Sequence, residues 1–411
     1  MPALVPSRLA IPASIWLLVG AATAEQVFVS GARPAWAAEA AELSSSPLLL
    51  QDYRPQSMLR VPAHPRVHAR FPVVDVHTHF TVRLHDSEEG LDDFVRAMDQ
   101  QQIAVCASMD AKLGDTWQEH ANYLWRRYPD RFVVFVHVDW QGSGSGSDPA
   151  SWDCHRPDFA RQVARLLATA RQQGASGVKI FKQLGLGYRN PDKTLVRIDD
   201  PRWDPIWAAC GELGLPIMMH TADPMAFFLP VDKQNERWDE LQRHPDWSFY
   251  GGDFPKYEEL LDARNRVIAR HPRTQFIGAH VASSAEDLQQ VGHWLDQYPN
   301  LTVDLASRIS ELGRQPYTAR EFFLRYQDRI LFGTDGPWPT ERLALYWRFL
   351  ETRDEYFPYS EKPFPPQGLW SIYGVELPDE VLRKVYHENA CRLIPGVRER
   401  WEKFSKAFVP P

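Results

Sequence analysis

The chain has 411 residues, of which 44% are hydrophobic and 24% charged, the composition of an ordinary globular protein. It is long enough for one α/β barrel of about 300 residues and an additional segment. The net charge of -7 and the lack of a basic stripe in the sequence argue against a nucleic-acid partner. A small anionic substrate stays open, because a local cationic pocket does not need a basic protein.

The N-terminus has the pattern of an export signal. Arg8 precedes an apolar segment at residues 9–19, and an A-x-A cleavage pattern follows at residues 22–24. The apolar segment is too short for a membrane-spanning helix. We therefore expect residues 1–24 to be a signal peptide and the protein to be periplasmic or extracellular, without stable membrane insertion. A disordered apolar N-terminus is the alternative.

The body of the chain alternates short apolar strands with helices. The strands are predicted at residues 73–80, 103–109, 132–138, 177–181, 216–220, 274–280, 301–306 and 330–335. The helices between them are predicted at residues 91–101, 117–128, 159–172, 206–213, 257–269, 288–297 and 322–328. Nearly continuous apolar strands are typical of parallel sheets that are buried on both faces. The pattern predicts an α/β fold, a (β/α)₈ TIM-type barrel, with a doubly wound open sheet as the alternative.

The barrel is expected to be a single catalytic domain at residues 71–395 with a short N-terminal extension. Residues 25–70, rich in Ala, Pro and Ser, are expected to form a linker or an arm on the domain surface. Residues 396–411 are expected to be a C-terminal tail. The four cysteines lack C-x-x-C spacing and resemble small buried hydrophobic residues, although a disulfide between two of them stays open.

Polar side chains stand at the carboxyl ends of four predicted strands. These residues are His77 and His79 on strand one, His220 on strand five, His280 on strand six and Asp335 on strand eight. All these ends meet at one face of a barrel, where active sites form. Zinc and similar divalent ions bind histidine nitrogen and carboxylate oxygen and keep an open position for water. We expect His77, His79, His220 and Asp335 to form such a metal shell.

These motifs together resemble the amidohydrolase superfamily. The resemblance rests on Asp75-Val-His77-Thr-His79, Met219-His220-Thr221, Gly278-Ala279-His280 and Phe332-Gly-Thr-Asp335, and it covers Phe71 to about Pro395. The chain is most similar to the branch that includes aminocarboxymuconate-semialdehyde decarboxylase and related metal-dependent hydrolases. Residues 386–393 resemble the C-terminal helix of this branch, in which Asn389 is expected to bond backbone rather than substrate.

The resemblance implies roles for the residues at the strand ends. His77, His79, His220 and Asp335 would hold a divalent metal ion, zinc foremost and manganese as the alternative, with one ion expected rather than two. Asp335 would also accept the proton of a water molecule. His280 would be the general acid/base or would polarise the substrate, and its competing role is as ligand to a second metal ion. Asp75 would orient one of the ligands, with a structural hydrogen bond as the alternative.

Three cationic residues are candidates for further roles near the site. Binuclear members of the superfamily use a carbamylated lysine on strand four, where this chain offers Lys179 and Lys182. A bridge between two metal ions, a contact to a substrate anion and a solvated lysine all stay open for them. Arg308 follows strand seven and suits a substrate carboxylate by its two-pronged geometry, or it pairs with an internal carboxylate.

These residues predict a metal-dependent hydrolase that acts on an ester, lactone or amide of a small substrate. A non-oxidative decarboxylase, a carboxy-lyase, is the alternative that the nearest branch suggests. A binding protein without catalytic activity is a weaker alternative. The partner expected is a small-molecule substrate that is anionic or contains a ring, and a homodimer is left open.

Overall fold

The computed structural model describes residues 47–49, 52–53, 55–114, 116–363 and 366–407. The chain divides into two compact units, Met1–Met58 and Leu59–Pro411. The predicted signal peptide at residues 1–24 and residues 25–46 of the predicted arm lie outside the described residues. In the first unit the amide of Asp52 donates to the carbonyl oxygen of Leu49 at 2.9 Å.

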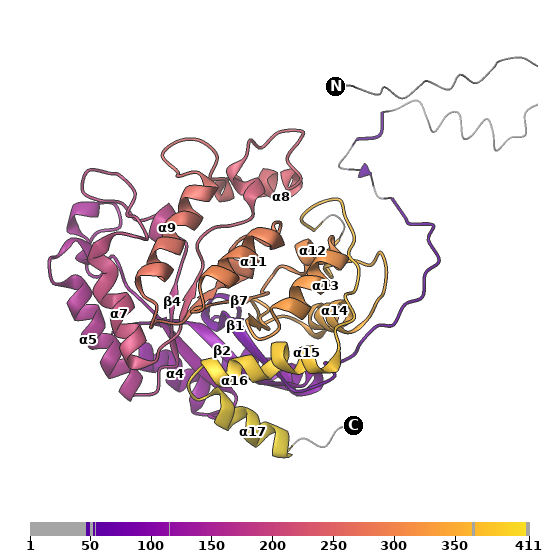
Figure 1. Ribbon diagram of the computed structural model, residues 1–411, viewed down its shortest axis with the longest axis horizontal. Coiled ribbons are helices and arrows are strands. Elements are labelled where there is room, and N and C mark those ends of the chain that lie inside the picture. Colours follow the sequence, from indigo (N-terminus) through magenta and orange to yellow (C-terminus); the bar gives the residue numbers. More distant parts are fainter. Residues whose placement is uncertain (1–46, 50–51, 54, 115, 364–365, 408–411) are drawn as a thin grey trace, which may run out of the picture. The chain divides into compact units, whose positions relative to one another are not determined.

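The second unit is an eight-stranded parallel barrel surrounded by helices (Figure 1). The strands pair in sequence order: β1 (Val73–Thr78), β2 (Ile103–Lys112), β3 (Phe132–His137), β4 (Gly177–Ile180), β5 (Ile217–Met219), β6 (Phe276–Gly278), β7 (Leu301–Asp304) and β8 (Ile330–Leu331). The amide of Val76 donates to the carbonyl oxygen of Phe332 at 3.0 Å, and the amide of Asp335 donates to that of His77 at 2.8 Å. These bonds close the barrel between β8 and β1, so the predicted fold class is confirmed.

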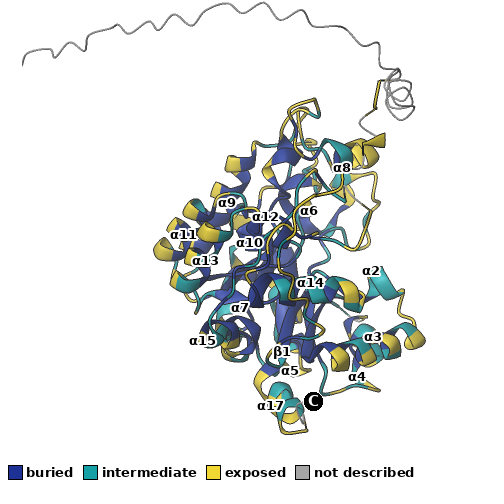
Figure 2. Ribbon diagram, turned by 90° about the vertical axis from the view of Figure 1, so that its right-hand side faces the viewer, coloured by how far each residue is buried: buried dark blue, intermediate teal, exposed yellow. Residues whose placement is uncertain are grey.

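One long helix follows each strand on the outside of the barrel. These helices are α3 (Glu88–Gln101), α4 (Trp117–Trp125), α5 (Phe159–Gln172), α7 (Asp204–Leu213), α9 (Tyr257–Arg270), α11 (Leu288–Gln297), α13 (Pro316–Arg325) and α14 (Thr340–Glu351). Helix α3 shows why such segments are helical: the Ser87 side chain caps its first turn by accepting from the amide of Gly90, and Leu91, Phe94 and Met98 form a buried stripe. Figure 2 shows this division, with buried residues on the strands and exposed residues on the outer helix faces.

Shorter helical segments lie in the loops. They are α2 (Phe80–Leu84), α6 (Gln183–Leu186), α8 (Trp238–Arg243), α10 (Ala279–Ala282), α12 (Ile309–Leu312) and the 3₁₀ turns at Pro149–Ser151, Asp153–His155, Pro201–Trp203, Met225–Phe228 and Pro245–Trp247. The loop after β5 carries α8 and two of these turns before α9 begins. It is therefore an ordered insertion at the face of the barrel that carries the predicted site.

Two hydrophobic cores hold the barrel together. The larger core lies between the strands and the surrounding helices. The smaller core fills the barrel interior with Val74, Val133, Phe135, Met218 and Ile277, together with other residues that point inward from the strands. Such interior layers make a TIM barrel a packed core rather than a pore.

The C-terminal segment closes the amino end of the barrel. It consists of α15 (Asp379–Arg383), a π-helical turn η7 (Lys384–Glu388), α16 (Asn389–Leu393) and α17 (Val397–Ala407). Ala390, Ile394 and Val397 belong to the core inside the barrel, and Trp401 packs against that core. Residues 397–407, which the sequence predicts as a tail, thus form a helix that packs on the domain. The Asn389 side chain donates to the carbonyl oxygens of Gln327 and Ile330, as expected for a structural residue.

The segment before β1 lies along the surface of the barrel domain. His64 contacts Asp354 through its backbone amide and its ring nitrogen Nδ1, each at 2.7 Å. The amide of Arg70 donates to Glu351 at 2.8 Å. Residues 59–70 of the predicted linker therefore have the contacts of a surface arm.

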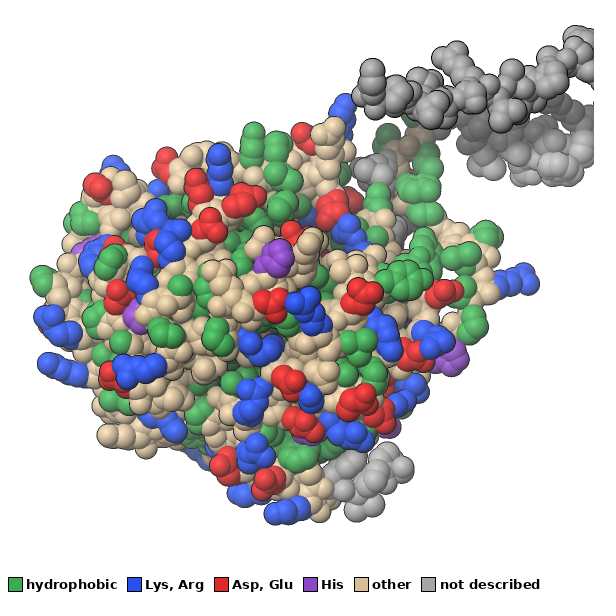
Figure 3. Space-filling model, viewed as in Figure 1, with side chains coloured by type: hydrophobic (Ala, Val, Ile, Leu, Met, Phe, Trp, Pro, Cys, Tyr) green, Lys and Arg blue, Asp and Glu red, His purple; other side chains and the backbone are tan. Residues whose placement is uncertain are grey.

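The described surface carries interspersed charges. On the face in Figure 3, basic and acidic side chains alternate over the domain. Within the described ranges, no helix has the length and apolar character needed to cross a membrane. All four cysteines are free thiols, so the disulfide that the sequence leaves open does not form in this structure.

Candidate metal centre

The strand ends bring three of the four predicted ligands together. Asp335 Oδ1 lies 3.6 Å from His77 Nε2 and 3.4 Å from His79 Nε2. The candidate ligand atoms of these three residues all lie within 4.8 Å of one another. His77 is fully buried, whereas the side chains of His79 and Asp335 keep 13% and 25% of their exposure. The group is therefore reachable from solvent on one side.

Two buried carboxylates orient the imidazoles of this group. Asp304 Oδ2 lies 2.8 Å from His77 Nδ1, and Asp110 Oδ1 lies 2.6 Å from His79 Nδ1. Because a carboxylate accepts, each Nδ1 donates its proton, and Nε2 is the nitrogen of each ring that is left for a metal ion. Sequence reasoning missed both aspartates. They stand at the carboxyl ends of β7 and β2, so the strand-end rule that finds the histidines would also have found them.

A second group of possible ligand atoms consists of His77, His280 and Asp304. Asp304 is already used there, because its Oδ1 accepts from the backbone amides of His280 at 2.8 Å and Ala306 at 3.0 Å. Its other oxygen bonds to His77. The atoms of this group therefore bond to one another, and the group with His79 and Asp335 is the better candidate for a metal ion.

Asp75 is buried below the site, and its contacts are to backbone and hydroxyl groups. Its Oδ1 accepts from the amides of His77 and Thr334 at 3.1 Å each, and its Oδ2 accepts from the Thr334 hydroxyl at 2.5 Å. Burial raises the pKa of Asp75 to about 7. Asp75 makes the structural hydrogen bonds that the sequence leaves as the alternative, and Asp304 and Asp110 orient the imidazoles.

His220 stands apart from the other predicted ligands. Its ring centroid lies 4.5 Å from that of His280, and its Nε2 lies 3.3 Å from Asp223 Oδ1. Lys182 forms an ion pair with the same Asp223. The structure therefore does not place His220 in the group of three. Lys182 is engaged by a carboxylate of the β5 loop rather than lying free toward a second metal ion.

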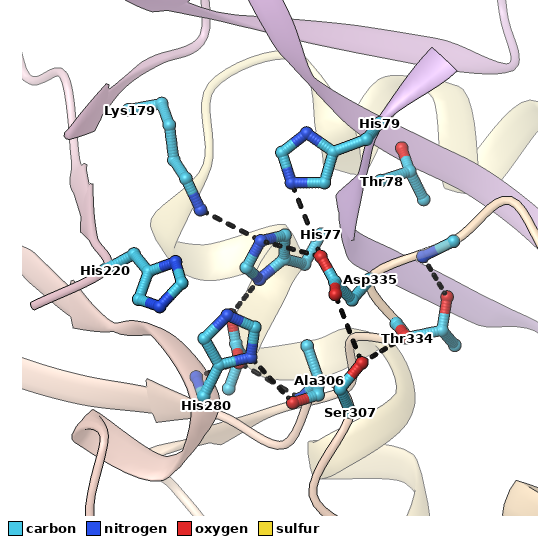
Figure 4. Close-up of polar contacts among 12 residues, drawn as sticks. His77, Thr78, His79, Lys179, His220, His280, Ala306, Ser307, Thr334 and Asp335 are labelled. Atoms are coloured by element: carbon cyan, nitrogen blue, oxygen red, sulfur yellow. Dashed lines mark hydrogen bonds and ion pairs between the residues drawn. The ribbon is translucent and has the colours of Figure 1, made fainter. Parts of the chain in front are cut away.

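Lys179 extends from β4 into the site. Its Nζ lies 2.9 Å from His77 Nε2, and its side chain is buried. Burial lowers the pKa of Lys179 to about 8, although Asp304 and Asp335 act in the opposite direction. Figure 4 shows Lys179, His77, His79, His220 and His280 around one space, with Asp335 at its edge. The lysine therefore reaches the site and is not solvated, whereas a metal bridge and a contact to a substrate anion both stay open for it.

His280 has one nitrogen fixed and the other directed to the site. Its Nδ1 lies 2.8 Å from the carbonyl oxygen of Ala306, which can only accept, so Nδ1 carries the proton. Burial, and then the neighbouring charges of His220 and Arg308, lower the pKa of His280 well below its usual value. The imidazole is therefore neutral, and its Nε2 has a free lone pair on the side of His77 and His220 (Figure 4).

Asp335 carries the negative charge of the site. Burial acts to raise its pKa, but His77, His79 and Arg83 outweigh burial, and the pKa is lowered overall. The hydroxyl of Ser307 donates to its Oδ2 at 3.2 Å. Asp335 is therefore ionised, with Oδ1 free for a ligand and Oδ2 held by a hydrogen bond.

A cavity of about 300 Å³ opens beside Ser307. Its lining includes Arg243, Trp247, Ser307, Arg342, Tyr346 and Lys362. The predicted anion ligand Arg308 is mostly buried, and one guanidinium nitrogen donates to the carbonyl oxygen of Ser307 at 2.9 Å. Arg308 is thus next to the cavity without lining it, and the basic residues that face the cavity come from α8, α14 and the loop after α14.

The residues of the site fit a divalent metal ion. The two imidazoles direct their Nε2 atoms toward Asp335, whose ionised carboxylate oxygen faces both. Burial, and then the positive charge of Lys179, lower the pKa of His77 well below its usual value, which keeps it neutral as a ligand must be. Nitrogen and oxygen donors of this kind suit zinc or manganese.

Solved structures of other proteins are similar to this chain. One is 2,6-dihydroxybenzoate decarboxylase from Rhizobium, at 18% identity, with 79% of this chain and 98% of that chain covered and a TM-score of 0.43. Another is 4-oxalomesaconate hydratase from Rhodopseudomonas palustris, at 13% identity, with 82% and 99% covered and a TM-score of 0.47. A third is 5-carboxyvanillate decarboxylase from Novosphingobium aromaticivorans in complex with manganese, at 15% identity, with 82% and 99% covered and a TM-score of 0.41.

The part of the sequence that forms the barrel and its strand-end site matches the model of a known protein family. The model of the Amidohydrolase family, in its amidohydrolase-2 branch, matches residues 74–396. This range begins in β1 and ends just after α16, so it includes every strand of the barrel and every residue of the candidate site. The chain belongs to the amidohydrolase family.

Proposed function

We propose that this protein is a metal-dependent hydrolase that cleaves an ester, lactone or amide bond of a small anionic substrate. His77, His79 and Asp335 would hold the ion, and His220 would join them if its Nε2 turned away from Asp223. A bound divalent ion supplies a Lewis acid that acidifies water and polarises a carbonyl group. The remaining chemistry falls to the side chains around it.

The state of His280 is the observation that carries the proposal. Its Nδ1 donates a hydrogen bond to the carbonyl oxygen of Ala306, so Nε2, the nitrogen on the side of the site, is unprotonated in the neutral ring. A neutral imidazole in this tautomer accepts a proton first and donates it afterwards. Hydrolysis needs this order, because the attacking water loses a proton before the leaving group gains one.

Asp335 supports the same sequence of proton transfers. It is ionised and contacts both imidazoles of the candidate ligands, and Ser307 fixes its second oxygen. A carboxylate held in this way orients a water molecule and shares its proton with a nearby base. Lys179, which reaches the same space, supplies a positive charge for an oxyanion that develops on the substrate.

The cavity next to the site supports an anionic substrate. Arg243, Arg342 and Lys362 line it, and Glu240, the acidic residue among the lining residues, is paired with Arg237. Trp247 and Tyr346 add aromatic surface for a ring. A carboxylate on the substrate, remote from the bond that is cleaved, suits this lining.

Non-oxidative decarboxylation is the second candidate, because Lys179 and Arg308 place positive charge at the site. Lys179 contacts His77, and Arg308 lies one residue from Ser307, which contacts Asp335. Such charges would hold a carboxylated substrate. Against this candidate, His280 has no proton on the side of the site to give to a carbon atom.

The two candidates are separated by the products. The protein reconstituted with zinc or manganese is assayed against lactones, esters, amides and aromatic carboxylic acids in water labelled with ¹⁸O. Label in the organic product supports hydrolysis. Release of carbon dioxide together with an organic product that carries no label contradicts it. A variant with His280→Gln is expected to lose turnover in either case, and Arg325→Gln, an exposed change on α13, is the matched control.

A further inference from the structure

The residue proposed as the base stands at the start of a left-handed turn. His280, Val281, Ala282 and Ser283 have φ angles of 58°, 56°, 53° and 59°. The ψ angles of His280 and Val281, 49° and 48°, complete the left-handed helical conformation. Residues other than glycine visit this region singly, and a β-branched residue such as Val281 is a clear outlier there. Four in a row therefore need a strong local cause.

Two buried side chains of α9 hold the far end of this turn. The Arg264 guanidinium donates through Nη1 to the carbonyl oxygen of Ala282, and the Tyr257 hydroxyl donates to that of Ser283. Asp304 holds the near end by accepting from the amide of His280 at 2.8 Å. Hydrogen bonds thus hold the turn at both of its ends.

Arg264 is a buried arginine without a carboxylate partner among the described residues. Its side chain is fully buried, and burial lowers its pKa to about 10. Within the described part of the chain it forms no ion pair; besides Ala282 its nitrogens donate to Asn265 Oδ1, and it lies over the ring of Trp294 at 4.4 Å. Arginine is almost never fully buried without a charged partner, because its desolvation is costly.

Gly278, at the end of β6, leaves room for the turn. A Cβ on Gly278 would lie 2.7 Å from Cβ of Ala282, so the turn folds back onto the end of β6. The same fold places the amide of Ala222, in the β5 loop, at 3.1 Å from the Ser283 hydroxyl oxygen. The turn is therefore packed against the two strands that carry His220 and His280.

We propose that Arg264 and Tyr257 are positioning residues that lock residues 280–283 in the left-handed turn and thereby aim the unprotonated Nε2 of His280 into the site. They touch neither the site nor a substrate; they act through the backbone of the turn. The catalytic consequence rests on the function proposed above, whereas the structural one does not. Released from the clamp, residues 280–283 relax toward right-handed geometry, and the bond from His280 Nδ1 to Ala306 is lost with it.

The test follows the Nδ1 proton of His280 by NMR in the metal-loaded protein with ¹⁵N-labelled histidine. The resonance is assigned by its absence in His280→Gln. Tyr257→Phe, which keeps the ring and removes the hydroxyl, is expected to speed exchange of this proton about tenfold, the loss of one buried hydrogen bond. Arg264→Met is expected to speed it more. Arg266→Met is the matched control on the same helix, because Arg266 is half exposed and pairs with Asp199 on the outside of the barrel.

Turnover provides the second readout. With a substrate found in the assay above, Arg264→Met is expected to lower kcat about 100-fold at nearly unchanged KM, the effect of a misplaced catalytic group. The metal content is expected to stay at the level of the unmodified protein, because His77, His79 and Asp335 lie on other strands. Adding Ala282→Gly to Arg264→Met is expected to restore part of kcat and of the exchange protection, because glycine adopts the left-handed conformation without strain.

Two results would overturn the proposal. One is unchanged exchange of the His280 proton in both Tyr257→Phe and Arg264→Met. The other is exchange of the His280 proton that is as fast in the double variant, Arg264→Met with Ala282→Gly, as in Arg264→Met alone. That result would leave Arg264 with a packing role only. If the assay finds no hydrolysis, the exchange measurements still decide the role of the clamp, so the two proposals fail separately.

Discussion

Asp304→Asn is the change that most sharply tests how the site is built. Asp304 is fully buried, and its two oxygens have different tasks. Oδ1 accepts from the amides of His280 and Ala306, so this position must stay an oxygen. In the variant, the amide nitrogen is therefore forced to the position of Oδ2, opposite His77 Nδ1.

The forced orientation changes the tautomer of His77. Nδ1 now faces a donor and must accept, so the ring carries its proton on Nε2, the atom that faces His79 and Asp335. A protonated Nε2 cannot bind a metal ion. Loss of such an orienting carboxylate typically weakens metal affinity by about 10- to 100-fold, which is about 1.4–2.8 kcal/mol.

The assay is a titration of zinc or manganese against a chromogenic chelator, with Asp130→Asn as control, because Asp130 pairs with Lys403 on the outside of the barrel. The control is expected to keep the affinity of the unmodified protein. Circular dichroism checks that the variant folds, since asparagine preserves the volume of the side chain. An Asp304→Asn protein that binds the ion as tightly as the unmodified chain would refute this reasoning about the tautomer.

Three further predictions concern the cavity, the acid stability and the thiols. Arg342→Gln is expected to raise KM for a carboxylate-bearing substrate about tenfold and to leave a neutral analogue unaffected, as a charged hydrogen bond in the cavity requires; steady-state kinetics with the two substrates decide this. Burial lowers the pKa of His387 to about 4, below its ordinary value of 6.5. As the pH falls, the unfolded chain therefore binds this proton before the folded protein does. About 3 kcal/mol of the free energy of unfolding, fully present above pH 6.5, is lost as the pH falls toward 4. Urea unfolding of His387→Phe, which keeps a ring against Trp401, is expected to depend less on pH over this interval, and an equal dependence would speak against it. Burial raises the pKa of all four cysteine thiols, so a thiol reagent is expected to react slowly with the native protein and with all four thiols in denaturant; fewer than four would reveal a disulfide.

The strands could be predicted because each one leaves a local signal. An apolar run of residues buried on both faces marks each strand. Seven predicted strands contain the observed one, and β2 extends three residues beyond the predicted 103–109, to Lys112. Helix α14 is not predicted, because Tyr346, Trp347, Phe349 and Leu350 bury most of its circumference and blur the amphipathic stripe. The eight-fold repeat itself required a helix at this place.

The site could be predicted only in part because its geometry depends on long-range contacts. His77, His79 and Asp335 converge because they end strands that are neighbours when the barrel closes, and the fold implies that neighbourhood. The pairing of His220 with Asp223 depends on the conformation of the β5 loop, for which the sequence has no local signal. The left-handed turn at His280 is equally hidden, because Val281 and Ala282 do not favour that conformation.

The metal content of the purified protein tests the central claim most directly. The protein is loaded with zinc or manganese, dialysed and measured by mass spectrometry, next to His77→Ala and His79→Ala variants that are shown to be folded. We expect one tightly held ion per chain and none in either variant. A folded protein that retains no ion, or a His77→Ala variant that retains as much as the unmodified chain, would contradict a metal centre at His77, His79 and Asp335.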